Sequence, residues 1–125
     1  MAIIWIEKVH GRQISNEDVT ITKTKSKDGR RKWYIALKNG YGKKIDKKGN
    51  GSIMVGLDGT KMYFVSSPNG YKLMDQNYGH RISISEAAIT ENLPGFVMPI
   101  GDFNMYFDNE QKKYYIDLEQ KIIFE

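Results

Sequence analysis

The sequence predicts an α+β fold that is mostly β, with antiparallel hairpins around one core and one short helix near residues 84–93. Eight tyrosines and five phenylalanines favour strands. Short apolar-rich runs are separated by turn signals, and 125 residues suffice for a single domain, 1–125, with a real core. The turn-forming Asp-Gly and Asn-Gly dipeptides stand at 28–29, 39–40, 58–59 and 69–70.

The first segment, MAIIWIEKV, is expected to form a strand. No basic segment precedes its apolar run, and the run is too short for a signal core or a membrane span. The chain has no cysteine, which excludes disulfides and thiolate metal sites and fits a reducing compartment. We therefore expect a cytoplasmic protein that does not associate with membranes.

Alternation of apolar residues selects the register of the hairpin around Asp28-Gly29. A two-residue turn would divide the apolar residues between both faces. A three-residue loop, 27–29 with Gly29 left-handed, pairs Val19 with Leu37, Ile21 with Ile35 and Lys23 with Trp33, and so collects the apolar side chains on one face. The other face then carries hydroxyls, cations and an aromatic: Thr20, Thr22, Thr24, Ser26, Arg30, Lys32 and Tyr34.

Two further hairpins and the helix follow from similar signals. A two-residue turn at Asp58-Gly59 is expected, and a four-residue turn from Asp108 to Gln111 would pair Phe103 with Ile116 and Met105 with Tyr114. Ser83 or Ser85 caps the helix, which Pro94-Gly95 ends. The expected core residues are Ile3, Trp5, Ile21, Trp33, Ile35, Ile53, Val55, Phe64, Ile84, Phe103, Ile116 and Leu118.

Charge is divided unevenly along the chain. Residues 1–50 hold 13 Lys and Arg against 5 Asp and Glu, whereas residues 51–125 hold 6 against 10. The Lys/Gly stretch 40–51 is expected to be a mobile loop or a linker, so a basic hairpin region 1–48 and a β-rich region 51–125 are possible sub-modules. Such asymmetry indicates a polyanionic partner, a match between the halves, or only a ribbon kept soluble by lysines.

These charges make nucleic-acid binding the leading functional hypothesis. Lysine and arginine attract phosphate without regard to sequence, and aromatic rings can stack unpaired bases. Tyr34 shares the polar face with Lys32, whereas Trp33 is expected in the core. The predicted binding residues of the basic β-ribbon and the following loop are Lys23, Lys25, Lys27, Arg30, Arg31, Lys32, Tyr34, Lys43 and Lys44.

Catalysis is not expected, and no cofactor or metal is predicted. His10 and His80 each stand beside a glycine, where a solvated turn residue is more common than a base or a metal ligand. Four carboxylates cluster around the last hairpin, Asp102, Asp108, Glu110 and Asp117. Metal or acid/base chemistry would need two of them to converge in a pocket, and Asp108 and Glu110 lie in a turn, where such residues are usual. The segment GYGKKIDKKGNG lacks the ending of a phosphate-binding loop.

Residues 70–120 resemble the AbrB/MraZ-type swapped-hairpin module. The matching features are Gly79-His80-Arg81 at a turn, a strand with Ile82 and Ile84, Leu93 at a helix end, and Gly101-Asp102 before a final hairpin. The closing YYIDL is also similar to that of small phage-borne proteins. The resemblance implies a homodimer whose basic residues face DNA, here Arg81 and Lys72.

In this module, helix positions that are often basic correspond here to Ala87, Ala88, Thr90 and Glu91, and PGFVMPI is an insertion. Nucleic acid would therefore bind the N-terminal ribbon. The hypothesis is a small non-enzymatic nucleic-acid-binding protein, phage-encoded and regulatory if the resemblance holds. The alternative is a phage-type inhibitor or adaptor whose same basic surface binds a host protein, such as a nucleic-acid-processing or defence protein. No residue pattern decides between the two.

Overall fold

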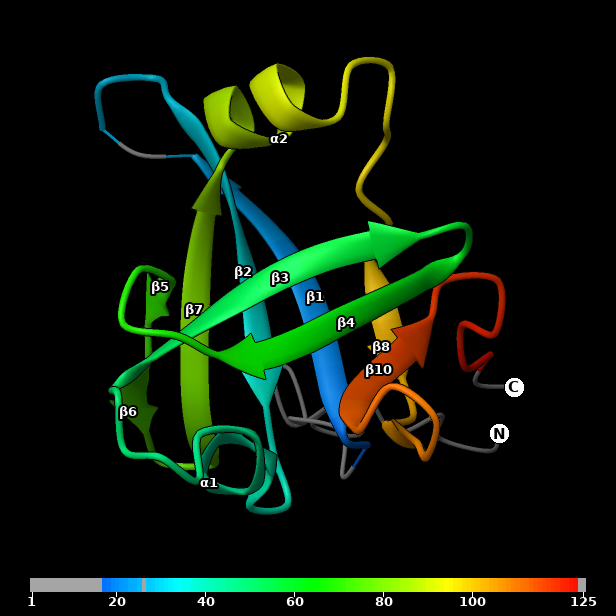
Figure 1. The fold of residues 1–125 in the computed structure, drawn as a ribbon. Helices are drawn as coiled ribbons and strands as arrows, with labels where there is room; N and C mark the ends of the chain where they lie inside the picture. Colours follow the sequence, from blue (N-terminus) through cyan, green and yellow to red (C-terminus); the bar gives the residue numbers. More distant parts are fainter. Residues whose placement is uncertain (1–16, 26, 124–125) are drawn as a thin grey trace, which may run out of the picture.

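The computed structural model describes residues 17–25 and 27–123, which form two antiparallel five-stranded sheets and two short helices. The fold is α+β and mostly β, as predicted. Figure 1 shows the two sheets as layers whose strands cross at a steep angle, with α2 at one end and α1 at the other. No described helix is long and apolar enough to cross a membrane.

Each sheet combines strands from distant parts of the chain. Sheet A has the order β6-β7-β2-β1-β8 and sheet B the order β5-β3-β4-β10-β9. The strands of sheet A are Met74–Gln76 (β6), Gly79–Ser85 (β7), Arg31–Leu37 (β2), Val19–Lys25 (β1) and Gly101–Phe103 (β8). Those of sheet B are Tyr71–Lys72 (β5), Ser52–Asp58 (β3), Lys61–Ser66 (β4), Lys113–Asp117 (β10) and Tyr106–Asp108 (β9). Pairing of β2 with β7 joins the basic N-terminal half to the C-terminal half.

The β1–β2 hairpin has the predicted register. Val19 is opposite Leu37, Ile21 opposite Ile35 and Lys23 opposite Trp33. Gly29 has φ 84°, the left-handed conformation that the three-residue loop requires. The apolar side chains of both strands are therefore buried on one face of sheet A.

The β3–β4 hairpin has a two-residue turn, but the turn lies one residue later than predicted. Asp58 pairs with Lys61, so the turn residues are Gly59 and Thr60. Gly59 has φ 62°, as the first turn residue of a type II′ turn does. The shift changes the pairing register by two residues, so the apolar side chains stay on the same face of the hairpin as predicted. Leu57 is now opposite Met62.

The last hairpin is shorter than predicted, and two of its expected pairs are wrong. Phe103 lies in β8 and pairs with Val19 in sheet A, not with Ile116. Tyr114 is opposite Phe107, not Met105, and the turn contains residues 109–112. The chain thus crosses between the sheets at 104–105, and Phe103 and Met105 both reach the core without sharing a strand.

Helix α2 (Glu86–Asn92) agrees with the predicted helix, and Ser85 is its cap because the Ala88 N–H donates to the Ser85 Oγ at 3.1 Å. A second helix was not expected. Residues predicted to be a mobile loop form α1 (Tyr41–Ile45), in which Ile45 is buried. The expectation of one helix and a loop was wrong, because α1 is stabilised by the packing of its side chains in the core and not by local helix propensity.

One apolar core lies between the sheets and includes residues of both helices. Eight of the predicted core residues are buried: Ile21, Trp33, Ile35, Ile53, Phe64, Ile84, Phe103 and Ile116. Val55 and Leu118 are only partly buried against this core. Ile3 and Trp5 lie outside the described residues.

Candidate nucleic-acid interface

Six cationic side chains gather at the end of the β1–β2 hairpin, which we call the ribbon tip (residues 23–32). Figure 1 shows this end projecting beside α2. Lys25 is opposite Arg31, and Thr24 is opposite Lys32. Alternation therefore divides the cations between both faces of the ribbon. The tip residues Lys23, Lys25, Lys27, Arg30 and Arg31 are exposed, and Lys32 is partly buried.

Two carboxylates contact the arginines of the ribbon tip. The Arg30 Nε lies 3.2 Å from Asp28 Oδ2, and the Arg31 Nε lies 4.0 Å from Glu86 Oε2. The Arg30 side chain is nevertheless 87% exposed. Exposed ion pairs of this kind contribute little to stability and are screened by salt, so a phosphate can compete for these guanidinium groups.

Tyr34 lies on the outer face of sheet A between two cations from different strands. The Arg81 Cζ is 3.9 Å from the centre of the Tyr34 ring, and the Lys32 Nζ is 5.3 Å from it. Arg81 reaches Tyr34 because β7 pairs with β2, where Tyr34 is opposite Ser83 and Ala36 is opposite Arg81. The fold thus brings Arg81 to Lys32 and Tyr34, two predicted site residues that are distant from it in sequence.

A groove of about 660 Å³ runs along the outer face of sheet A from the ribbon tip. Hydroxyl groups of β1 line one side, and Tyr34 and Arg81 line the other. Such a surface offers hydrogen-bond donors, acceptors and the rings of two tyrosines. The polar and aromatic residues of the groove include Thr20, Thr22, Thr24, Tyr34, Tyr78 and Arg81.

The far end of the groove contains two residues that the sequence hypothesis did not include, Lys38 and Asp102. The Lys38 Nζ donates to Thr20 Oγ1 at 2.5 Å, and the Thr20 hydroxyl donates to Asp102 Oδ1 at 2.6 Å. Desolvation by burial lowers the pKa of Lys38, and Asp102 opposes this shift. Lys38 could have been predicted for this face, because it follows Tyr34 and Ala36 in the alternation of side chains. Asp102 could not, because its position depends on the unexpected pairing of β8 with β1.

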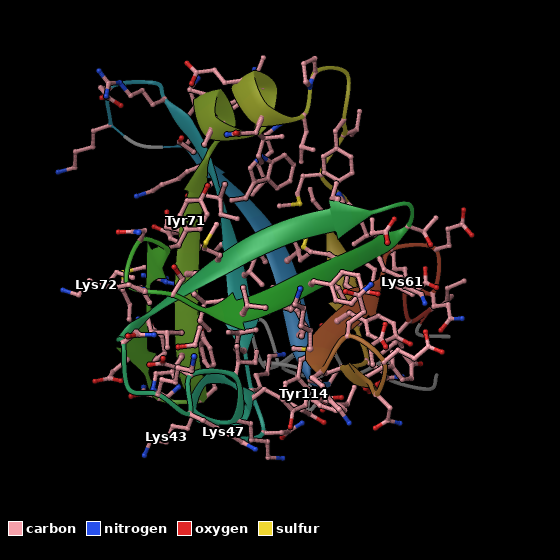
Figure 2. All side chains as sticks on the ribbon, viewed as in Figure 1. Lys43, Lys47, Lys61, Tyr71, Lys72 and Tyr114 are labelled. Carbon is pink, nitrogen blue, oxygen red and sulfur yellow. The ribbon has the colours of Figure 1, made fainter. Side chains whose placement is uncertain are left out.

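Lys43 and Lys44 are not part of this surface. Both belong to α1, which lies at the end of sheet A opposite the ribbon tip (Figure 1), and Figure 2 shows Lys43 there. The Lys44 Nζ instead lies 4.5 Å from the centre of the Tyr41 ring. Lys72 lies in β5 of sheet B, which contacts β7, the strand of sheet A that contains Arg81.

His80 is not the solvated turn residue that the sequence suggested. Its side chain is 16% exposed, and its Nε2 lies 3.2 Å from Asp75 Oδ1. A Cβ at Gly42 would lie 2.4 Å from His80 Nδ1, so the ring packs directly against α1. His10 lies outside the described residues.

Asp102 is separated from the other acidic residues with which the sequence grouped it, because it lies in sheet A while Asp108 and Asp117 lie in sheet B. Within the described part of the chain, no group of three or more His, Asp or Glu side chains could hold a metal ion. No protein-family model, curated protein or solved structure matches this chain.

Proposed function

We propose that this protein binds nucleic acid through the ribbon tip and the adjoining outer face of sheet A. The supporting observation is that Lys23 of the tip lines the groove that contains Tyr34 and Arg81, and that Lys32 of the tip lies against the Tyr34 ring. Lysines and arginines at the tip would contact phosphates, and the groove would accept sugars or bases.

The Tyr34–Arg81 pair favours a single strand over a duplex as the ligand. Aromatic rings and guanidinium planes stack on unpaired bases, which a duplex keeps within its own stack. The proposed interface contains Lys23, Lys25, Lys27, Arg30, Arg31, Lys32, Tyr34 and Arg81. Lys43 and Lys44 are left out because they lie at the opposite end of sheet A.

Fluorescence anisotropy with labelled single-stranded and double-stranded oligonucleotides, at two salt concentrations, tests this proposal. We expect binding of the single strand that weakens as salt rises. An absence of binding at low salt, together with stoichiometric capture of one acidic protein through the same ribbon, would instead support the inhibitor or adaptor function. In that case the ribbon would recognise protein carboxylates in place of phosphates.

A further inference from the structure

The outer face of sheet B carries a row of three tyrosines, one on each of three adjacent strands. Tyr106 of β9 is opposite Tyr115 of β10, which is opposite Tyr63 of β4. The ring centres lie 5.6 Å and 5.5 Å apart, and the rings are tilted by 33° and 44°. The rings therefore lie side by side, and the row ends at Tyr63.

The next position in this row, on β3, is Gly56, the register partner of Tyr63. Among the residues that the structure describes, no atom lies within 4 Å of the point that a Cβ at Gly56 would occupy. A hollow of about 250 Å³ lies here beside Tyr63, with Met54, Val65 and Asp58 among its walls. A planar group from another molecule could thus extend the row at a place where residues 17–25 and 27–123 supply no side chain.

The Tyr63 ring is held in place by Asp108. The Tyr63 hydroxyl donates to Asp108 Oδ2 at 2.9 Å, and Asp108 Oδ1 accepts the backbone N–H groups of Glu110 and Gln111. This hydrogen bond raises the pKa of Tyr63 to about 12, so the phenol stays neutral. A ring that is already fixed loses little conformational freedom when a ligand stacks on it.

The charges around the row favour a cation as the ligand. The hollow itself is lined by one carboxylate, Asp58, and one lysine, Lys113. The described residues of the surrounding face add two carboxylates, Asp108 and Asp117, against one lysine, Lys61, so carboxylates exceed lysines by one. The Lys61 Nζ, labelled in Figure 2, already lies 5.0 Å from the centre of the Tyr115 ring. A nucleotide would bring a phosphate toward these carboxylates, whereas a guanidinium is planar, cationic, and able to stack on tyrosine while pairing with a carboxylate.

We propose that the hollow beside Tyr63 binds an arginine side chain of a partner protein. The guanidinium stacks on Tyr63 and pairs with the carboxylate of Asp58, while Met54 and Val65 contact the methylene groups. This site lies on sheet B, so it is separate from the proposed nucleic-acid interface on sheet A. The failure of one proposal would leave the other intact.

Titration of the full-length protein, ¹⁵N-labelled, with an acetylated Gly-Arg-Gly amide tests the proposal by nuclear magnetic resonance. We expect saturable shifts of the backbone amides of Gly56 and Tyr63, with dissociation constants on the order of millimolar. The matched tripeptide with lysine should bind about tenfold more weakly, because an ammonium group neither stacks nor pairs bidentately. Equal affinities for both peptides would overturn the proposal.

Two substitutions locate the site. Asp58→Asn should weaken the arginine peptide about tenfold, whereas Asp117→Asn, which makes the same charge change outside the hollow, should have little effect. Gly56→Leu should abolish binding by filling the hollow, and its spectrum shows whether the fold is kept. Equal effects of the two aspartate substitutions would contradict the proposal. So would saturation of the hollow by uridine monophosphate in place of the arginine peptide.

Discussion

The guanidinium carbon of Arg81 lies 3.9 Å from the centre of the Tyr34 ring, which joins two residues 47 positions apart in sequence on the outer face of sheet A. This stacked pair borders both the cationic ribbon tip and the groove. Under the proposed nucleic-acid binding, this pair would add a contact to sugars or bases beside the phosphate contacts of the tip.

Tyr34→Ala should weaken single-stranded binding more than duplex binding. If the ring supports a stacked base, the expected loss is roughly 1–3 kcal/mol for the single strand. Anisotropy titrations with both oligonucleotides measure the difference. Tyr34→Phe is the matched control, because it keeps the ring and should bind like the parent protein. Equal losses for single strand and duplex would exclude a stacking function for Tyr34.

Gly42→Ala should destabilise the protein by about 1–3 kcal/mol, as overpacking of a filled interior commonly does. The added methyl would lie 2.4 Å from His80 Nδ1 and 2.9 Å from His80 Cβ, so the ring cannot move aside without shifting its strand. Gly56→Ala is the control, because its methyl would enter open space. Urea unfolding of the two variants provides the comparison, and an unchanged midpoint for Gly42→Ala would refute the packing of α1 on β7.

Acid should weaken the fold partly through Asp46. The pKa of Asp46 is lowered first by the Ser66 hydroxyl hydrogen bond and further by the backbone N–H groups of Gly51 and Asn50. A carboxylate whose folded pKa is depressed stabilises the fold above its ordinary pKa of 3.8, and this contribution is lost as pH falls through the lower folded value.

Asp46→Asn should therefore be less stable than the parent near neutral pH and should lose less stability on acidification. Unfolding by urea at about pH 7 and about pH 3 measures both effects, over the pH range in which carboxylates titrate. Ser66→Ala should reduce the acid sensitivity in the same direction, because it removes the largest cause of the shift. Parallel pH profiles of the parent and Asp46→Asn would show that this carboxylate does not couple to folding.

The homodimer implied by the family resemblance remains a prediction. Static light scattering at tens of micromolar, an order of magnitude at which weak dimers form, should give about twice the mass of one chain. The mass of one chain at that concentration would count against the dimer. The same measurement on Asp58→Asn shows whether the hollow on sheet B takes part in any association.

Alternation of side chains was enough to predict the β1–β2 register, because only one pairing puts Val19, Ile21 and Trp33 on one face. The same rule failed for Phe103 and Met105. Their alternation continues into β9, as it would in one long strand, but the chain leaves sheet A between Phe103 and Met105. The pattern of apolar residues would be the same for one continuous strand and for two strands in different sheets. Local sequence patterns do not indicate which strands pair over long sequence separations.

The helix α1 and the site show the same limit. Residues 41–45 contain glycine and lysines without an acidic first turn, so local signals favoured a loop, yet the burial of Ile45 and the contact of Gly42 with His80 hold a helical turn. The cations of the ribbon tip could be predicted because they are adjacent in sequence. The stacking of Arg81 on Tyr34 could not, because it depends on the pairing of β2 with β7.

If the cations of the ribbon tip bind phosphate, changing Lys25, Arg30 and Lys32 together to glutamine should alter the salt dependence of binding. The control changes Lys43 and Lys44 of α1, together with the following Lys47, to glutamine, which removes the same charge at the other end of the fold (Figure 2). The ribbon variant should bind oligonucleotides of every sequence more weakly. The slope of log binding constant against log salt concentration should become shallower by about 0.7–0.9 for each lost phosphate contact. The α1 variant should keep the parent slope. Equal slopes for the two variants would show that binding follows net charge and does not depend on the ribbon tip.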